Sequence, residues 1–189
     1  MSTRGSVGLL VGFVALAAVV VGNVLSAPLA KAYSTEGGRW QYNLSIHFYE
    51  QPMQSYDTQA FDDGVYAWNS SVAPILFGGT GTQEVIMSDT NAGNSNWVGL
   101  TTWSYSTFGC NYPIGYNQFY DAYTKLNIYY TQKEDRATRQ GDAAHELGHA
   151  IGLGHSSVTT ALMYYKQNGT NTPQSDDING VNYIYAHSC

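Results

Sequence analysis

Alternation between polar and apolar residues marks the first predicted strand of the chain. The pattern spans Asn43 to Tyr49, and successive side chains of a strand point to opposite faces of a sheet. A different periodicity follows over residues 56–69, where apolar side chains recur at helical spacing and predict a helix. These side chains are Phe61, Val65 and Trp68. The folded part of the chain thus begins with a strand followed by a helix.

The second half of the pattern predicts several more strands and two further helices. Strands are expected over residues 84–88, 97–103 and 125–131, the second of them near an edge. Residues 104–121 are rich in Gly, Pro, Asn and Tyr and predict an irregular loop. A helix is expected from Thr138, as its N-cap, to Ile151, and a last helix follows the N-cap Ser175. This order of elements is typical of a mixed α/β domain with one sheet and a few packed helices.

The N-terminus carries a pattern typical of an export signal. Arg4 precedes a long apolar run from Val7 to Leu25, and small residues then lead to an A-x-A cleavage pattern at residues 30–32. We therefore predict a signal peptide over residues 1–32 and a single secreted, extracellular domain over residues 33–189. The alternative is an uncleaved anchor, because the uncharged run is long enough to span a bilayer. In both cases the folded domain would face outside the cell.

Composition and charge narrow the function classes. The formal net charge is −6 with only 8 Lys and Arg residues, which argues against nucleic acid as a partner. No stretch after the N-terminal run is apolar enough to span a membrane, so no membrane association is expected for the mature domain. The two cysteines are Cys110 and Cys189, and in an exported chain they are expected to form one disulfide. The competing interpretation is a zinc-ligating thiol.

The decisive segment runs from His145 to His155 and reads H-E-x-x-H-x-x-G-x-x-H. His145 and His149 are four residues apart, so on a helix their imidazoles lie on one face and can point at one ion. Gly152 can take a positive φ and end the helix. The chain would then turn and bring His155 back toward the same ion. The alternative is that these are ordinary surface or core histidines, but the fixed offsets of the motif argue against it.

The ligand set predicts a catalytic zinc ion. Three neutral imidazoles with an open fourth position are typical of a catalytic rather than a structural zinc site, although such a set also suits cobalt, nickel or copper in vitro. Glu146 directly follows the first ligand, where its carboxylate can act as general base toward a zinc-activated water and then protonate the leaving amine. Eight residues after His155 lies Met163, which is expected to pack beneath the metal as a Met-turn without ligating it.

The extended motif followed by a Met-turn is the signature of the metzincin zinc peptidases, and the chain resembles one metzincin family, the matrixins. The likeness rests on residues 145–163, with Gly-Leu-Gly-His-Ser at 152–156 and Ala-Leu-Met-Tyr at 161–164, and on the last helix at residues 175–185. The resemblance implies the zincin fold, an α/β (α+β) architecture with a twisted, mixed five-stranded sheet. A long helix, an active-site helix and a C-terminal helix would accompany a mostly parallel sheet with one antiparallel edge strand.

The same resemblance implies how substrate is held. An extended polypeptide would lie along the edge strand over residues 97–103, and the active-site helix and residues 164–173 would form the walls of the specificity pocket. The expected substrate-binding residues are Val98, Gly99, Leu100, Thr101, Tyr164 and Tyr165. The family's second, structural zinc site has no ligands here, because no histidine occurs between residues 48 and 144. Calcium is possible but not assignable, with Asp89 and Asp121 as candidates.

These observations predict a secreted zinc-dependent metalloendopeptidase that acts as a monomer on extended polypeptide. A second hypothesis is an inactive binding protein with the same fold, which the presence of Glu146 and of all three ligands disfavours. A third is a toxin-like enzyme with one narrow substrate. Sequence does not distinguish it from a broad protease, because fold and site define the chemistry and not the target.

Overall fold

The computed structural model describes residues 32–40, 44–78, 84–110 and 116–186, without the side chains of residues 107–110 and 116. The chain divides into two compact units, Met1–Ala30 and Lys31–Cys189. The predicted signal peptide lies outside the described residues except for its last position, so the description below concerns the second unit. Within the described ranges, no helix is both long and apolar enough to cross a membrane.

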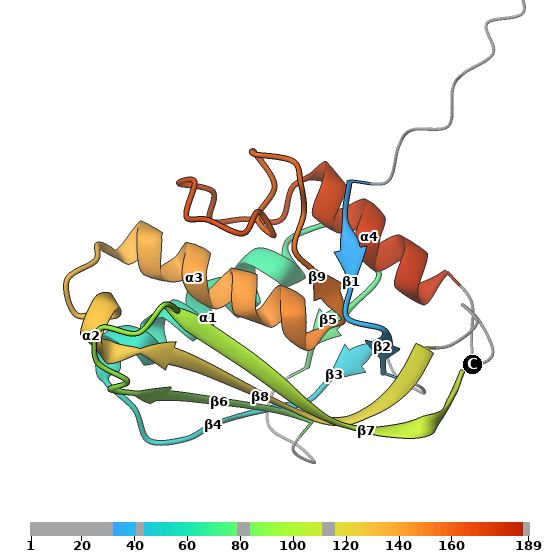
Figure 1. Ribbon diagram of the computed structural model, residues 1–189, viewed down its shortest axis with the longest axis horizontal. Helices are drawn as coiled ribbons and strands as arrows, with labels where there is room; N and C mark the ends of the chain where they lie inside the picture. Colours follow the sequence, from blue (N-terminus) through green and yellow to red (C-terminus); the bar gives the residue numbers. More distant parts are fainter. Residues whose placement is uncertain (1–31, 41–43, 79–83, 111–115, 187–189) are drawn as a thin grey trace, which may run out of the picture. The chain divides into compact units, whose positions relative to one another are not determined.

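Five strands form the central sheet, which lies below the helices in Figure 1. They are β2 (Gly38–Arg39), β4 (Phe48–Glu50), β6 (Val85–Thr90), β7 (Gly99–Cys110) and β8 (Tyr116–Asn127). Strands β4, β6 and β8 run parallel to one another, and β2 pairs in parallel with the beginning of β8. Strand β7 pairs antiparallel with β8 and forms the edge. A mostly parallel sheet with one antiparallel edge strand confirms the expected fold class.

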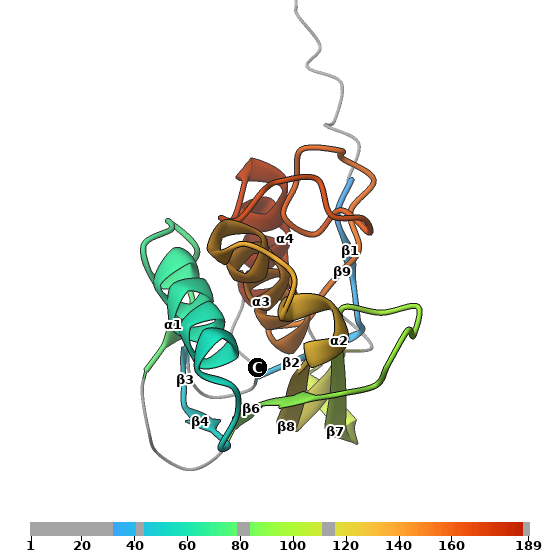
Figure 2. The same ribbon diagram turned by 90° about the vertical axis from the view of Figure 1, so that its left-hand side faces the viewer.

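Two long helices, α1 (Ser55–Asn69) and α3 (Arg136–Ala150), cover one face of this sheet (Figure 2). They lie side by side, and the indole of Trp68 in α1 donates a hydrogen bond to the carbonyl of Ala144 in α3 at 2.8 Å. The core lies between these helices and the sheet. Its largest fully buried side chains include Phe61, Trp68, Met87, Leu126, Leu147 and Ile151. The helix that carries the histidine motif is therefore held by the main core.

The structure corrects the predicted loop over residues 104–121. Strand β7 continues to Cys110, and β8 begins at Tyr116. Composition over the whole segment concealed an alternation within it, because Phe119 is buried while the adjacent Tyr120 is exposed. The two strands pair antiparallel, with two register shifts, and so satisfy the backbone groups that face each other. The edge strand is therefore much longer than its apolar pattern indicated.

The predicted strand over residues 125–131 is wrong in its second half. Strand β8 ends at Asn127, and α2 (Ile128–Thr131) is a short helix. The side-chain oxygen of Asn127 accepts hydrogen bonds from the backbone N–H groups of Tyr129 at 3.2 Å and of Ala92 at 3.0 Å. This buried side chain caps the helix and holds the segment that leads into β7, two tertiary roles that apolar periodicity does not reveal.

The caps of the two later helices also differ from the prediction. Helix α3 is capped by Asp135, whose carboxylate accepts from the backbone N–H of Thr138 at 2.8 Å. Thr138 thus donates its backbone N–H to the cap and does not supply the capping side chain. Helix α4 (Ser175–Tyr185) is capped by Gln174 in a capping box with Asp177, and not by its own first residue. The helices themselves were predicted correctly, with ends displaced by one to three residues.

Two short two-stranded sheets complete the fold. Strand β1 (Ser34–Thr35) pairs antiparallel with β9 (Leu153–Gly154), and β3 (Ser45–Ile46) pairs in parallel with β5 (Leu76–Phe77). The strand predicted over residues 43–49 is therefore two strands, β3 and β4, that belong to different sheets. Strand β1 bears on function because its partner β9 lies between the second and third histidines of the motif.

Candidate metal centre

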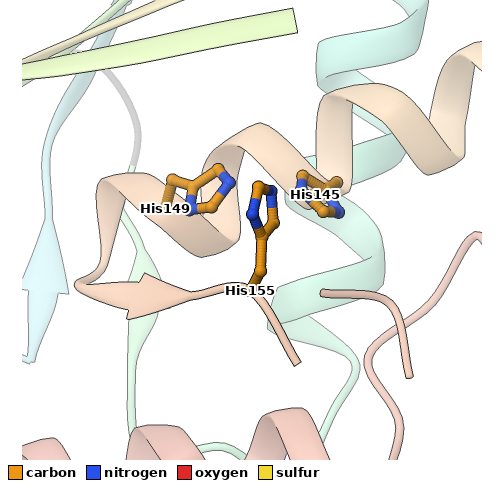
Figure 3. Close-up of side chains that lie close together, drawn as sticks. All are labelled: His145, His149 and His155. Carbon is orange, nitrogen blue, oxygen red and sulfur yellow. The ribbon is translucent and has the colours of Figure 1, made fainter. Parts of the chain in front are cut away.

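Three imidazole rings converge beside the C-terminal half of α3 (Figure 3). His145 and His149 project from one face of the helix, and His155 follows strand β9. The ring centroids are 4.8 Å apart for His145 and His149, 5.3 Å for His145 and His155, and 4.9 Å for His149 and His155. One nitrogen of each ring lies within 4.8 Å of the others. Within the described residues, no other group of three His, Cys, Asp or Glu side chains is close enough to hold a metal ion.

Gly152 turns the chain so that the third ring can reach the first two. Helix α3 ends at Ala150, and Gly152 has a φ of 98°, a conformation that residues with a side chain rarely adopt. A Cβ at this position would also overlap the carbonyl oxygen of Gly38. Beyond the turn, the hydroxyl of Ser34 donates to the carbonyl of His155 at 2.6 Å. Strand β1 therefore helps to place the third histidine.

Backbone carbonyls orient the two helical rings. The Nδ1 of His145 lies 2.7 Å from the carbonyl oxygen of Leu162, and the Nδ1 of His149 lies 2.8 Å from that of Leu153. Each Nδ1 thus carries the proton and donates it, which leaves Nε2 with a lone pair for a metal. Glu36, just after β1, adds a carboxylate oxygen 3.4 Å from the Nδ1 of His149.

Two of the three rings, His145 and His155, are held in the neutral form that a metal ion requires. Burial lowers the pKa of His145 to about 3, and burial together with the nearby His149 lowers the pKa of His155. Burial opposes the charged form of His149 as well, but the hydrogen bond to Glu36 and the charge of Glu146 together raise the pKa of this ring. Three imidazoles arranged in this way are a donor set that zinc prefers, so the residues present fit a zinc ion.

The side chain of Glu146 projects from α3 toward the edge strand β7. It is buried, and the hydroxyl of Thr101 in β7 donates to its Oε2 at 2.7 Å. Gly99 leaves the space that this carboxylate occupies, because a Cβ at Gly99 would overlap it. Burial raises the pKa of Glu146, and the hydrogen bond from Thr101 partly opposes the rise. A carboxylate with a raised pKa is a better proton acceptor near neutral pH.

Met163 is almost completely buried and packs against α3. Its sulfur lies at Gly148, the residue before His149, and a Cβ at Gly148 would overlap it. The backbone N–H groups of Leu162 and Met163 donate to the carboxylate of Asp177 at 2.9 and 3.0 Å. Asp177 therefore holds the segment whose carbonyl orients His145. Sequence reasoning missed this role, because the helix dipole already accounts for a carboxylate in the first turn of α4.

A cleft of about 730 Å³ includes the metal-binding face. Its walls are residues 96–98 together with Gly99 at the start of β7, one face of α3 with its N-cap Asp135, and the segment that includes residues 164–170. Four of the expected substrate-binding residues line it: Val98, Gly99, Tyr164 and Tyr165. Leu100 is exposed, and the side chain of Thr101 is buried. The structure thus brings most of the expected residues to one cleft, and it adds polar residues of α3 and of the opposite wall that sequence reasoning missed.

Comparison with known proteins identifies the family. A peptidase family model described as matrixin matches residues 29–186. The chain belongs to the matrixin family. This membership confirms the resemblance noted in the sequence and places the chain in the enzyme class of the zinc metalloendopeptidases.

This matrixin is similar to several matrix metalloproteinases. It is 51% identical over 45 residues to matrix metalloproteinase-9 of Canis lupus familiaris, a match that covers 23% of this chain and 6% of the relative. It is 39% identical over 70 residues to matrilysin of Rattus norvegicus, which covers 34% of this chain and 26% of the relative. The match to interstitial collagenase of Oryctolagus cuniculus is 50% identical over 48 residues, 24% of this chain and 10% of the relative. The chain thus spans a minor part of the length of these relatives.

Two predictions about the surroundings of the site stay predictions. Cys189 lies outside the described residues and the side chain of Cys110 is not described, so the disulfide is untested. The calcium candidates Asp89 and Asp121 each accept a hydrogen bond from within the protein. Neither belongs to a group of three described side chains that could hold a metal ion.

Proposed function

We propose that this matrixin is a secreted endopeptidase that hydrolyses peptide bonds of extended polypeptides, with zinc held by His145, His149 and His155. The supporting observation is the convergence of three imidazoles beside a cleft that one buried carboxylate, Glu146, also lines. A site that only stored or sensed a metal would need the three rings but not this carboxylate. The combination therefore favours hydrolysis.

Zinc bound here would supply a Lewis acid that polarises the scissile carbonyl and lowers the pKa of a water molecule. The carboxylate of Glu146 accepts the proton of the attacking water and passes it to the nitrogen of the leaving amine. The hydrogen bond from Thr101 holds one carboxylate oxygen and so limits rotation of the group. Burial favours the protonated form of Glu146, which assists the accepting step.

The free side of β7 provides a backbone edge for the substrate. The carbonyl of Val98 accepts from the N–H of Asn127, so the backbone groups of Val98 face β8. Backbone N–H and C=O groups of successive residues in an antiparallel strand point alternately to its two sides, so those of Gly99 and Thr101 face away from β8. We infer that an extended substrate adds to β7 through these two residues, as in other complexes formed by strand addition.

Secretion is part of this proposal. Residues 1–32 would act as a signal peptide, residues 33–189 would be the catalytic domain, and Cys110 and Cys189 would form a disulfide. The apolar run and the A-x-A pattern support export, and an uncleaved anchor is the alternative. Mass spectrometry of the protein recovered from the medium tests both points. The expected chain begins at Tyr33 and gains about two mass units on reduction, since each cysteine then takes up one hydrogen.

The decisive experiment is cleavage of a denatured protein by the enzyme expressed from the full chain, beside the Glu146→Gln variant. We expect cleavage that a zinc chelator abolishes and that falls about a thousandfold or more in the variant, because the proton acceptor is lost. Zinc content should be equal in the two proteins. Glu84→Gln is the matched control, since Glu84 contacts His47 and not the metal centre. Substantial activity in Glu146→Gln would refute the role of this residue.

A further inference from the structure

The end of the cleft away from the histidines is acidic. Asp142 precedes His145 by three residues, so its Cα lies about 4.5 Å farther along the axis of α3, toward the N-terminus of the helix. Both residues line the cleft. Gln167 lies on the opposite wall, and its exposed side chain reaches across to Asp142. Asp142 therefore lies one helical turn beyond the metal-binding ring of His145.

Two carboxylates at this place share one neutral amide. The Nε2 of Gln167 lies 2.9 Å from each carboxylate oxygen of Asp142 and 3.0 Å from Oε1 of Glu134. The other oxygen of Glu134, Oε2, is buried and has no hydrogen-bond partner. An amide nitrogen has two protons and no charge, so it cannot satisfy four carboxylate oxygens or balance their charge. The group lacks a donor and a cation.

The cations nearby in the sequence do not contact these carboxylates. The ammonium of Lys166 lies 5.1 Å from the ring centre of Tyr165. The guanidinium of Arg139 lies 5.2 Å from the ring centre of Tyr56 and donates to the backbone carbonyls of Thr131 and Glu134. None of the ion pairs formed among the described residues includes Glu134 or Asp142. Burial, together with the charge of Glu134, raises the pKa of Asp142 to about 8. The pair therefore retains a proton near neutral pH in place of the missing counter-charge, and a bound cation would displace that proton.

The cleft between the histidines and Asp142 is partly apolar. Val98, Leu162 and Tyr164 line this part of the cleft. Lysine and arginine have an apolar stem and a charged head, so each can place methylene groups along such a wall and its cation at the acidic end. A purely aliphatic side chain would leave the carboxylates without a cation.

The direction of β7 relates this end of the cleft to one side of the scissile bond. Strand β7 runs along α3 in the same sense, because Thr101 contacts Glu146 and the indole of Trp103 donates to the carbonyl of His149. An added strand that pairs antiparallel with β7 therefore runs toward residues 96–99 and the N-terminal end of α3. The residue after the scissile bond then lies on the side of Asp142.

We propose that the acidic end of the cleft binds a lysine or arginine side chain of the substrate residue that directly follows the scissile bond. Asp142 contacts the charged head, Glu134 supports it from behind, and the exposed Gln167 moves aside. This inference rests on the proposed peptidase function. It adds the class of substrate side chain that this particular chain selects.

The test is digestion of a denatured protein mixture by the enzyme expressed from the full chain, with the new fragment ends read by mass spectrometry. We expect lysine and arginine to be enriched as the first residue after the cut. In Asp142→Asn, which keeps the shape and one acceptor, the enrichment should disappear. Asp62→Asn is the matched control, because it removes one acidic charge from an exposed position on α1. Ratios within one digest do not depend on how much of a variant is folded.

A pair of peptides built on one cleaved sequence, with lysine or norleucine after the cut, gives the magnitude. The ratio of their kcat/KM values should favour lysine about tenfold, as expected for a charged hydrogen-bonded contact, and should approach one in Asp142→Asn. Glu134→Gln should lower it less. Cleavage without lysine or arginine enrichment, or enrichment that persists in Asp142→Asn, overturns the inference and leaves the peptidase function intact. The absence of any cleavage overturns both.

Discussion

The two ends of the cleft are built in different ways. At the metal end, backbone carbonyls fix two of the three rings: His145 is oriented by the carbonyl of Leu162, and His149 by that of Leu153. At the acidic end, Asp142 and Glu134 meet the exposed side chain of Gln167 and form no ion pair with any described residue. One end is packed against the core, and the other is a half-buried group of side chains that the exposed Gln167 covers.

This difference teaches where chemistry and selectivity are encoded. The metal end can hold three rings to one point only because the core of the protein and strand β1 fix the backbone around them. The acidic end can change by single substitutions without disturbing that core, because its contacts are made by side chains. We therefore expect large, all-or-none effects at the first end and graded effects on substrate choice at the second.

The largest expected effect comes from His155→Ala. Removal of one of three ligands should abolish cleavage and reduce bound zinc well below one ion per chain, because two imidazoles hold zinc far less tightly than three. Elemental analysis of the purified variant and a cleavage assay measure both quantities. His47→Ala is the control, since His47 lies between β3 and β4 and outside the metal centre. Unchanged zinc content in His155→Ala would mean that the third ligand lies elsewhere.

A second prediction concerns the scaffold of the metal end. Asp177→Ala removes the acceptor of three backbone N–H groups, those of Leu162, Met163 and Gln174. We expect a loss of about 3 kcal/mol in the free energy of unfolding, because buried donors are left without partners. Urea denaturation measures it. Asp176→Ala is the matched control in the same helical turn, where the carboxylate accepts from the hydroxyl of Ser156. Equal losses in both variants would show that Asp177 acts only through the helix dipole.

The smallest expected effect on stability comes from the acidic end. Gln167→Ala removes an exposed amide and should change the free energy of unfolding by less than about 0.5 kcal/mol. The same denaturation experiment tests this, with the zinc content measured in parallel. A loss as large as that in Asp177→Ala would remove the distinction between an embedded end and an adaptable end of the cleft.

Much of the fold could be predicted from periodicity alone. The apolar spacing of Phe61, Val65 and Trp68 indicates α1, and the H-E-x-x-H spacing with Gly152 indicates both the end of α3 and the return of His155. The prediction failed where one side chain forms hydrogen bonds with two different segments. The strand predicted over residues 125–131 ends at Asn127, because the amide of this residue caps α2 and binds a distant loop. A side chain with roles in two segments leaves no periodic signal in either.

The sequence by itself predicted the three candidate ligands, the general-base candidate and the family, because these depend on residue type at short, fixed offsets within one helix and its turn. Tertiary structure alone decided what surrounds them. Glu36 contacts His149 from the end of β1. Asp177 holds the Met-turn from another helix, and Gln167 contacts Asp142 across the cleft. Such contacts join residues from distant parts of the chain, and only packing of the core brings those parts together.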